Sequence, residues 1–117
     1  MSYRIIPTPR FQKDVKYLKK KYRHIASDLE EFNNILGANP FYGEEITGLE
    51  GKVLKARLAS SDMRKGKGKG YRVIYYLSQK ENIIYLLTIY AKAYKENISV
   101  AEIKKIISRY GLYFFLF

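Results

Sequence analysis

The sequence predicts an α+β domain in which a twisted antiparallel sheet is backed by an antiparallel helical hairpin. Three observations predict this fold class: a short β-favouring stretch precedes two segments of helical periodicity, three β-favouring segments follow, and one more helical segment comes last. The expected sheet is a three-strand meander plus the N-terminal strand, and a C-terminal helix completes the fold. With 117 residues, 47% of them hydrophobic, the chain is sized for one domain, residues 1–117, with a modest core.

The N-terminal part is expected to form the first strand and the helical hairpin. Tyr3 to Pro7 (YRIIP) is predicted as a strand. Thr8 followed by Pro9 is typical of a helix start, because threonine caps the helix and proline needs no N–H donor there. Apolar residues then recur at helical spacing in two stretches: Phe11, Val15, Leu18 and Tyr22, then Ile25, Leu29, Phe32 and Leu36. The short KKYRH link between them indicates an antiparallel hairpin, and Gly37 is expected to end the second helix.

Three strands are expected after the hairpin. Residues 39–52 contain a proline and three glycines and are predicted to be loop or broken strand. The strands themselves are VLKARLA (53–59), YRVIYYL (71–77) and IIYLLTIYA (83–91). Alternation puts Val53, Lys55 and Arg57 on one face of the first strand, whereas the last strand is apolar on both faces, as a central strand would be. The four-residue QKEN link predicts a hairpin between the last two strands.

A capping signal introduces the final helix. Ser99 and Glu102 have the spacing of a capping box, and Gly111 is expected to end the helix. The apolar residues between these signals keep helical spacing: Val100, Ile103, Ile106, Ile107 and Tyr110.

Composition restricts the function. The chain has no cysteine and one histidine, which excludes disulfides and a thiolate nucleophile and argues against a zinc site. No metal and no cofactor is expected. The longest apolar runs are too short to span a bilayer and no signal peptide is visible, so we expect a cytoplasmic protein with no membrane partner. The 22 lysines and arginines against 11 acidic residues give a net charge of +11, which points to a polyanionic partner, most often nucleic acid.

The polar positions of the three strands are all cationic. Lys55 and Arg57 project from one face of the first strand, Arg72 begins the second, and Lys92 follows the third. If the strands pair as expected, these side chains converge on the sheet face away from the helical hairpin. A solvated face with lysines for solubility is the alternative. Like charges opposite each other destabilise strand pairing, and an anion would relieve their repulsion.

A basic loop, RKGKGKG, precedes the second of these strands. It is not a Walker phosphate loop, because it lacks the GK[ST] ending and no helix follows. Its cations, together with backbone N–H groups, suit a phosphodiester backbone, and the alternative is a solvated hairpin loop. Tyrosine is abundant, with 12 residues, and tyrosine rings stack on unpaired bases, although most tyrosines are expected to be half-buried strand residues. The predicted RNA-binding residues are Arg64, Lys65, Lys67, Lys69, Tyr76 and Tyr90.

Acid–base chemistry has few candidates in this chain. His24 is predicted to lie at the turn of the helical hairpin, where a surface or capping role is expected. Asp62 lies in the loop between the first two strands of the meander, without a context that predicts catalysis. No Ser–His–Asp arrangement and no pair of carboxylates in a useful context is present.

The segment ITGLEGKVLKARLASSDMRKGKGKGYRVIYYL, followed by IIYLLTIYAKAYKENIS, resembles the RelE/ParE superfamily of toxins from bacterial type II toxin–antitoxin pairs, particularly its HigB-like branch. The resemblance lies in the G-L-x-G-x-x-x-K-x-R entry, the basic loop followed by GYRVIYY, and the YLLTIYAK strand end. It covers about residues 43–106, and the strand–helix–helix preface agrees with the family's fold. The resemblance implies a single RelE-like toxin domain.

The resemblance also implies an activity and partners. Such toxins are metal-independent endoribonucleases (mRNA interferases) that cut mRNA in the ribosomal A site, against 16S rRNA, and a cognate antitoxin protein neutralises them. The 2′-hydroxyl of the RNA attacks the adjacent phosphate, so the protein positions that phosphate, stabilises its charge and moves protons. The implied catalytic residues are Lys55, Arg57, Arg72, Lys92 and, less cleanly matched, Tyr94.

Two alternatives stay open at the level of sequence. The first is a ParE-like inhibitor that binds DNA gyrase and performs no chemistry, and the second is an RNA-binding module without catalysis. The identity of the general base is also open among Tyr94, Lys55 and Lys92, because crowded cations can depress the pKa of a lysine.

Overall fold

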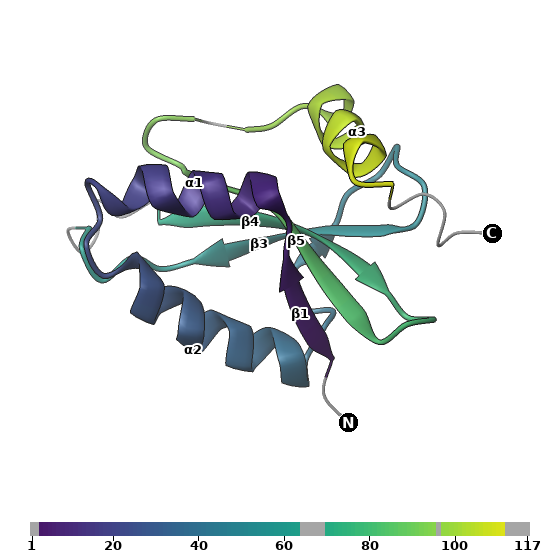
Figure 1. The fold of residues 1–117 in the computed structure, drawn as a ribbon, viewed down its shortest axis with the longest axis horizontal. Coiled ribbons are helices and arrows are strands. Elements are labelled where there is room, and N and C mark those ends of the chain that lie inside the picture. The colour runs from purple at the N-terminus through teal and green to yellow at the C-terminus, as the bar shows by residue number, and fades with distance from the viewer. Residues whose placement is uncertain (1–2, 64–69, 96, 112–117) are drawn as a thin grey trace.

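The computed structural model describes residues 3–63, 70–95 and 97–111. A five-stranded sheet forms the middle layer, with α1 and α2 packed on one face and α3 on the other (Figure 1). The elements in chain order are β1 (Arg4–Pro7), α1 (Pro9–Lys19), α2 (Ile25–Ala38), β2 (Glu44–Glu45), β3 (Lys52–Leu58), β4 (Tyr71–Ser78), β5 (Ile83–Ala91) and α3 (Val100–Arg109).

The expected fold class is confirmed, with one difference in strand direction. The strand order is β1-β5-β4-β3-β2, and β3, β4 and β5 form the predicted antiparallel meander. However, β1 pairs parallel with the first half of β5, with Arg4 opposite Ile83. The sheet is therefore mixed. No tight turn joins β1 to its partner, so nothing local in the sequence determines the direction in which this strand pairs.

The helix signals of the sequence are largely reproduced. The Thr8 hydroxyl accepts a hydrogen bond from the Phe11 N–H at 3.3 Å, and the Ser99 hydroxyl accepts one from the Glu102 N–H at 3.1 Å. Gly111 has a φ of +67°, as expected of a residue that ends a helix. Gly37 differs from the expectation, because α2 continues to Ala38 and Gly37 is a buried residue inside the helix. Its carbonyl accepts the Tyr3 N–H instead.

Two apolar cores hold the layers together. The larger core lies between the sheet and the α1–α2 hairpin, and includes Phe32, Tyr71 and Tyr75. The smaller core lies between the opposite sheet face and α3, and includes Ile74 and Tyr76. Successive residues of β4 thus alternate between the two cores, as the sequence alternation predicted. A membrane span would need a long apolar helix, and the described part of the chain contains none.

A β-bulge interrupts the pairing of β5 with β4. Leu86 is opposite Tyr75, but Thr88 is already opposite Ile74, so Leu87 is the extra residue. The start of α1 binds this bulge. The Thr8 N–H and Thr8 Oγ1 both donate to the Leu86 carbonyl, at 3.0 and 2.8 Å. Further along α1, Asp14 Oδ2 accepts a hydrogen bond from Thr88 Oγ1 at 2.5 Å.

We predict that Thr8→Val lowers the free energy of unfolding by about 1–2 kcal/mol, because it removes both a helix cap and a buried bond to the bulge. Urea denaturation measures the change. The control is Thr47→Val, which alters an exposed threonine and should change stability by less than about 0.5 kcal/mol. Equal losses in the two variants would contradict the anchoring role of Thr8.

Candidate functional site

The strand register places two arginines directly opposite each other. Arg57 on β3 is paired with Arg72 on β4, and Arg72 is paired in turn with Tyr90 on β5. Lys55 lies two residues before Arg57 and therefore projects from the same face. Arg57 is exposed, whereas Lys55 and Arg72 are half-buried. The structure thus brings together three of the cations that the sequence singled out, at one end of the sheet.

This arrangement creates an electrostatic cost that an anion would relieve. Side chains directly opposite on neighbouring strands have Cβ atoms about 4.5–5.5 Å apart, and like charges at that separation destabilise the pair. Arg72 Nη1 donates to the Tyr71 carbonyl at 3.2 Å, which draws its guanidinium toward the backbone of its own strand. A phosphate between the two guanidinium groups would receive charge-assisted hydrogen bonds from both strands.

Gly70 sets the position of Arg72 and of the chain after β5. Its φ is +61°, and a Cβ on this residue would lie 2.5 Å from the Leu58 carbonyl oxygen, so a residue with a side chain would strain the turn. The Gly70 carbonyl accepts the Lys92 N–H at 3.0 Å. Lys92 therefore lies at the same end of the sheet as Arg72. A glycine just before a predicted strand was the sequence signal for this constraint, and the sequence reasoning did not use it.

Tyr76 is a correction to the predicted RNA-binding set. It lies on the expected face, but α3 and its core cover that part of the face and leave Tyr76 only 2% exposed. Its ring stacks on Tyr85 with ring centroids 6.1 Å apart. It is also four residues along β4 from Arg72, toward the opposite end of the strand. A buried core ring cannot stack on a base, so Tyr76 is removed from the set.

The other predicted aromatic residues lie near the cations but differ in exposure. Tyr90 is 7% exposed, and burial raises the pKa of its hydroxyl, an effect that the charge of Arg72 partly offsets. Tyr94 is 68% exposed in the turn after β5, and Lys21 Nζ lies 4.2 Å from the centroid of its ring. Tyr94 therefore faces the α1–α2 turn. The predicted loop residues Arg64, Lys65, Lys67 and Lys69 lie outside the described residues.

Two carboxylates fasten the segment after β3 to the helical hairpin. Asp62 accepts hydrogen bonds from the His24 N–H and pairs with His24 Nδ1, each at 2.7 Å. These bonds from His24 lower the pKa of the Asp62 carboxyl. Asp28 accepts from the N–H and the hydroxyl of Ser61 at 3.0 and 3.2 Å. His24 thus pairs with a residue 38 positions away, which no local sequence signal indicates.

The described residues contain no cluster of metal-ligating side chains. Within residues 3–63, 70–95 and 97–111, no three His, Cys, Asp or Glu side chains lie close enough together to hold a metal ion. Lys55, Arg57, Arg72 and Tyr90 offer ammonium, guanidinium and phenol groups, which suit the binding of a phosphate and the stabilisation of its charge.

Known structures share this fold. No family model matches the chain. A double arginine-to-alanine mutant of the E. coli toxin RelE in the free state has a TM-score of 0.55 at 15% sequence identity, over 82% of this chain and 90% of that chain. The RelBE2 toxin–antitoxin complex from Mycobacterium tuberculosis gives 0.53 at 19% identity, over 78% and 99%. The archaeal RelE–RelB complex from Pyrococcus horikoshii gives 0.52 at 25% identity, over 79% and 97%.

These similarities define the fold of the chain as the fold of RelE toxins. This result is consistent with the RelE/ParE toxin superfamily that the sequence resembles. The three helices and the five-stranded mixed sheet of this chain are consistent with that fold.

We predict that Arg57→Gln raises the free energy of unfolding by about 0.2–1 kcal/mol at low salt, because it removes the like-charge pair with Arg72. The gain should shrink at 1 M salt, where the Debye length is about 3 Å. Lys52→Gln is the matched control: it removes the same charge from the same strand, but Lys52 is paired with Glu45 at 3.2 Å, so no gain is expected. Equal gains in both variants would mean that only the net charge matters.

Proposed function

We propose that this protein is the toxin of a type II toxin–antitoxin pair and that it acts as a metal-independent endoribonuclease on mRNA. The observation that supports this proposal best is the cross-strand pair of Arg57 and Arg72, with Lys55 beside it, at one end of a RelE-type fold. The net charge of +11 supports a polyanionic substrate.

The proposed reaction uses the 2′-hydroxyl of the RNA as the nucleophile. Its oxygen forms a bond to the neighbouring phosphorus while the bond to the 5′ oxygen breaks, which leaves a cyclic phosphate and a free 5′-hydroxyl. Negative charge builds up on the phosphate oxygens in the transition state, and Arg57 and Arg72 stabilise it. Because both guanidinium groups are held on adjacent strands, they are arranged before the substrate arrives.

Proton transfer is the second requirement of this reaction. A base takes the proton of the 2′-hydroxyl, and an acid donates one to the departing 5′ oxygen. Lys55 is our candidate base, because it projects from the same face as Arg57 and is half-buried. Lys92, held beside Gly70, is our candidate acid. Tyr94 contacts Lys21 across the turn, so we assign it to RNA binding at the margin of the site.

The proposed partners follow from the same fold. Several of the similar structures are complexes of a RelE toxin with a RelB antitoxin, which supports a cognate antitoxin protein for this chain. We further propose that the toxin cuts mRNA in the ribosomal A site, against 16S rRNA, in the cytoplasm. The cationic trio of Lys55, Arg57 and Arg72 favours RNA cleavage over a gyrase inhibitor or a non-catalytic RNA-binding module, neither of which needs converging cations beside a phosphate.

The central test is Arg72→Ala, which should lower the rate of mRNA cleavage in a translating extract by about 10²–10³-fold, because one donor to the transition state is lost. Lys104→Ala, which removes an exposed lysine of α3, is the control and should cleave at the parent rate. Circular dichroism and urea denaturation show whether both variants are folded. Unchanged cleavage by folded Arg72→Ala would refute the catalytic assignment. Arrested DNA supercoiling without RNA cleavage by the parent protein would favour the gyrase inhibitor.

A further prediction concerns the basic loop. If the site and the loop together contact about five phosphates of single-stranded RNA, the logarithm of the binding constant should fall with log[salt] with a slope of about −3.5. Replacement of Lys65, Lys67 and Lys69 by serine should flatten that slope and leave the chemical step intact. Binding of a non-cleavable RNA at several salt concentrations gives the slope. A slope near zero in the parent protein would show that the charge serves another purpose.

A further inference from the structure

A second recess lies beside the proposed phosphate site, on the free edge of β5. Strand β1 pairs only with residues 83–86 of β5, and α1 runs along the rest of that edge. Between α1, the end of β5 and the turn that follows is a cleft of about 620 Å³, within the usual range for small-molecule sites. Tyrosines and cations dominate its lining, which includes Tyr17, Tyr22, Tyr90, Tyr94, Lys21 and Lys95.

Tyr90 gives this cleft an unused hydrogen-bonding group. It lines the cleft and is 93% buried, and its hydroxyl has no hydrogen-bond partner among the described residues. A buried hydroxyl without a partner is costly, and native structures usually satisfy such groups with a ligand or with water. One face of the Tyr90 ring lies under Lys95, whose Nζ is 5.6 Å from the ring centroid.

The mouth of the cleft combines exposed aromatic rings with exposed cations. Tyr17 and Tyr94 are 73% and 68% exposed, so their rings are accessible to a ligand. Lys20 and Lys21 lie beside them on the segment after α1, and Lys21 Nζ is 4.2 Å from the ring centroid of Tyr94. Aromatic faces beside lysines are the combination that binds a nucleobase and its phosphate in single-stranded RNA.

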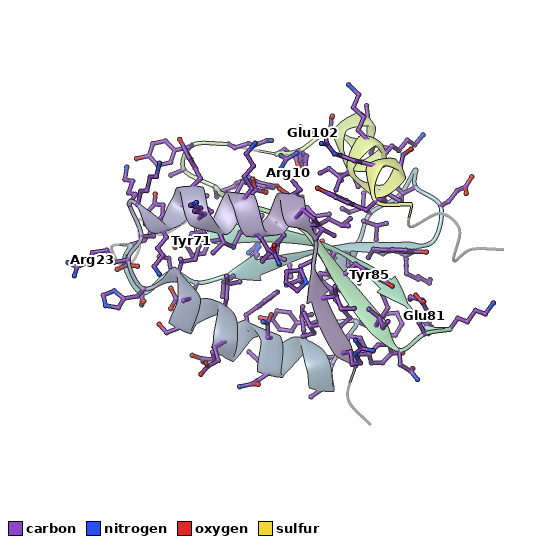
Figure 2. All side chains as sticks on the ribbon, viewed as in Figure 1. Arg10, Arg23, Tyr71, Glu81, Tyr85 and Glu102 are labelled. Atoms are coloured by element: carbon purple, nitrogen blue, oxygen red, sulfur yellow. The ribbon has the colours of Figure 1, made fainter. Side chains whose placement is uncertain are left out.

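Asp14 is the acidic residue among those that line the cleft, and it is already engaged. Asp14 accepts one hydrogen bond from Arg10 Nε at 3.2 Å and another from the Thr88 hydroxyl. Arg10 also pairs with Glu102 of α3 at 3.3 Å, and Figure 2 shows these two side chains facing each other between α1 and α3. Glu102 is bound in addition by Lys95 at 3.3 Å. The tyrosine rings of the lining offer stacking surfaces for a base, which the carboxylates of an acidic peptide would not use, so the lining favours a nucleotide.

We propose that this cleft binds one unpaired nucleotide of single-stranded RNA. The base stacks on the rings of Tyr17 and Tyr94, its polar edge pairs with the Tyr90 hydroxyl, and its phosphate lies at Lys20 and Lys21. Tyr90 is the direct neighbour of Arg72 in the sheet, so the cleft and the phosphate site share a wall. This proposal rests on the proposed function, because it takes RNA to be the substrate. It assigns the cleft to a nucleotide next to the one that is cut.

The test compares two double variants in the full-length protein. Tyr17→Leu/Lys21→Gln removes a ring and a charge from the cleft, and Tyr42→Leu/Lys16→Gln removes the same groups from exposed positions outside it. Loss of one stacked base should weaken binding of a 2′-O-methyl single-stranded RNA hexamer about five- to 100-fold in the first variant. The control should bind within about twofold of the parent. Thermal denaturation checks that both variants are folded.

Small-molecule probes test whether the nucleotide binds in the cleft. 5′-AMP should shift the NMR resonances of the Tyr17 and Tyr94 rings, and ribose 5-phosphate, which lacks the base, should bind more weakly. Equal binding of the two probes would overturn the proposal, as would equal loss of RNA affinity in the two double variants. Displacement by a glutamate decapeptide, with no shift caused by 5′-AMP, would also overturn it and would assign the cleft to a protein partner.

The outcomes separate this proposal from the proposed function. If 5′-AMP binds at Tyr17 and Tyr94 but the parent protein does not cut mRNA, the nucleotide cleft is supported and the nuclease assignment is refuted. If mRNA is cut and Arg72→Ala abolishes the cleavage, but the cleft variants bind RNA like the control, the nuclease assignment is supported and the nucleotide cleft is refuted.

Discussion

The hydrogen bonds between the start of α1 and the bulge in β5 determine which residues share the functional face. Thr8 binds the Leu86 carbonyl, Asp14 binds Thr88, and the extra residue between them shifts the side-chain alternation of β5 by one position. Without this shift, Tyr90 would point toward the α1–α2 core, and the wall between the proposed phosphate site and the tyrosine-lined cleft would be missing. A single local irregularity, held by one helix, thus aligns the end of β5 with Arg72.

The stability of the fold and the charge of its site have separate physical origins. Two apolar cores on opposite sheet faces stabilise the domain, and β4 contributes side chains to both of them. The cations lie at the end of the sheet that α3 leaves open, where the like-charge pair of Arg57 and Arg72 opposes strand pairing. Two guanidinium groups on adjacent strands present neighbouring donors that can both bind one external anion. This separation explains why a residue such as Arg57 is expected to affect stability and activity in opposite directions.

Much of the fold was predictable from local patterns in the sequence. The β5 strand was predicted with its observed bounds, Ile83–Ala91, because its apolar run has clear turn signals on both sides. The alternation of β3 and β4 correctly predicted that Lys55, Arg57 and Arg72 share a face. In contrast, an apolar run on both faces contains no sign of a bulge, so the shift in β5 was not predictable. The burial of Tyr76 depends on where α3 packs, and the pairing of His24 with Asp62 depends on residues far apart in sequence. These contacts are tertiary, and no periodicity encodes them.

The parallel pairing of β1 with β5 affects how the protein is made. Arg4 is synthesised before its partner, Ile83, which follows only after both helices and most of the meander. At about 5–20 residues per second, the N-terminal strand waits roughly 4–16 s on the ribosome before its neighbour in the sheet exists. Until β3, β4 and β5 have all been made, β1 and the apolar faces of α1 and α2 lack the complete sheet that covers them. The chain therefore cannot complete its sheet piece by piece as it emerges, and non-local closure of this kind is intrinsically slow and prone to aggregation.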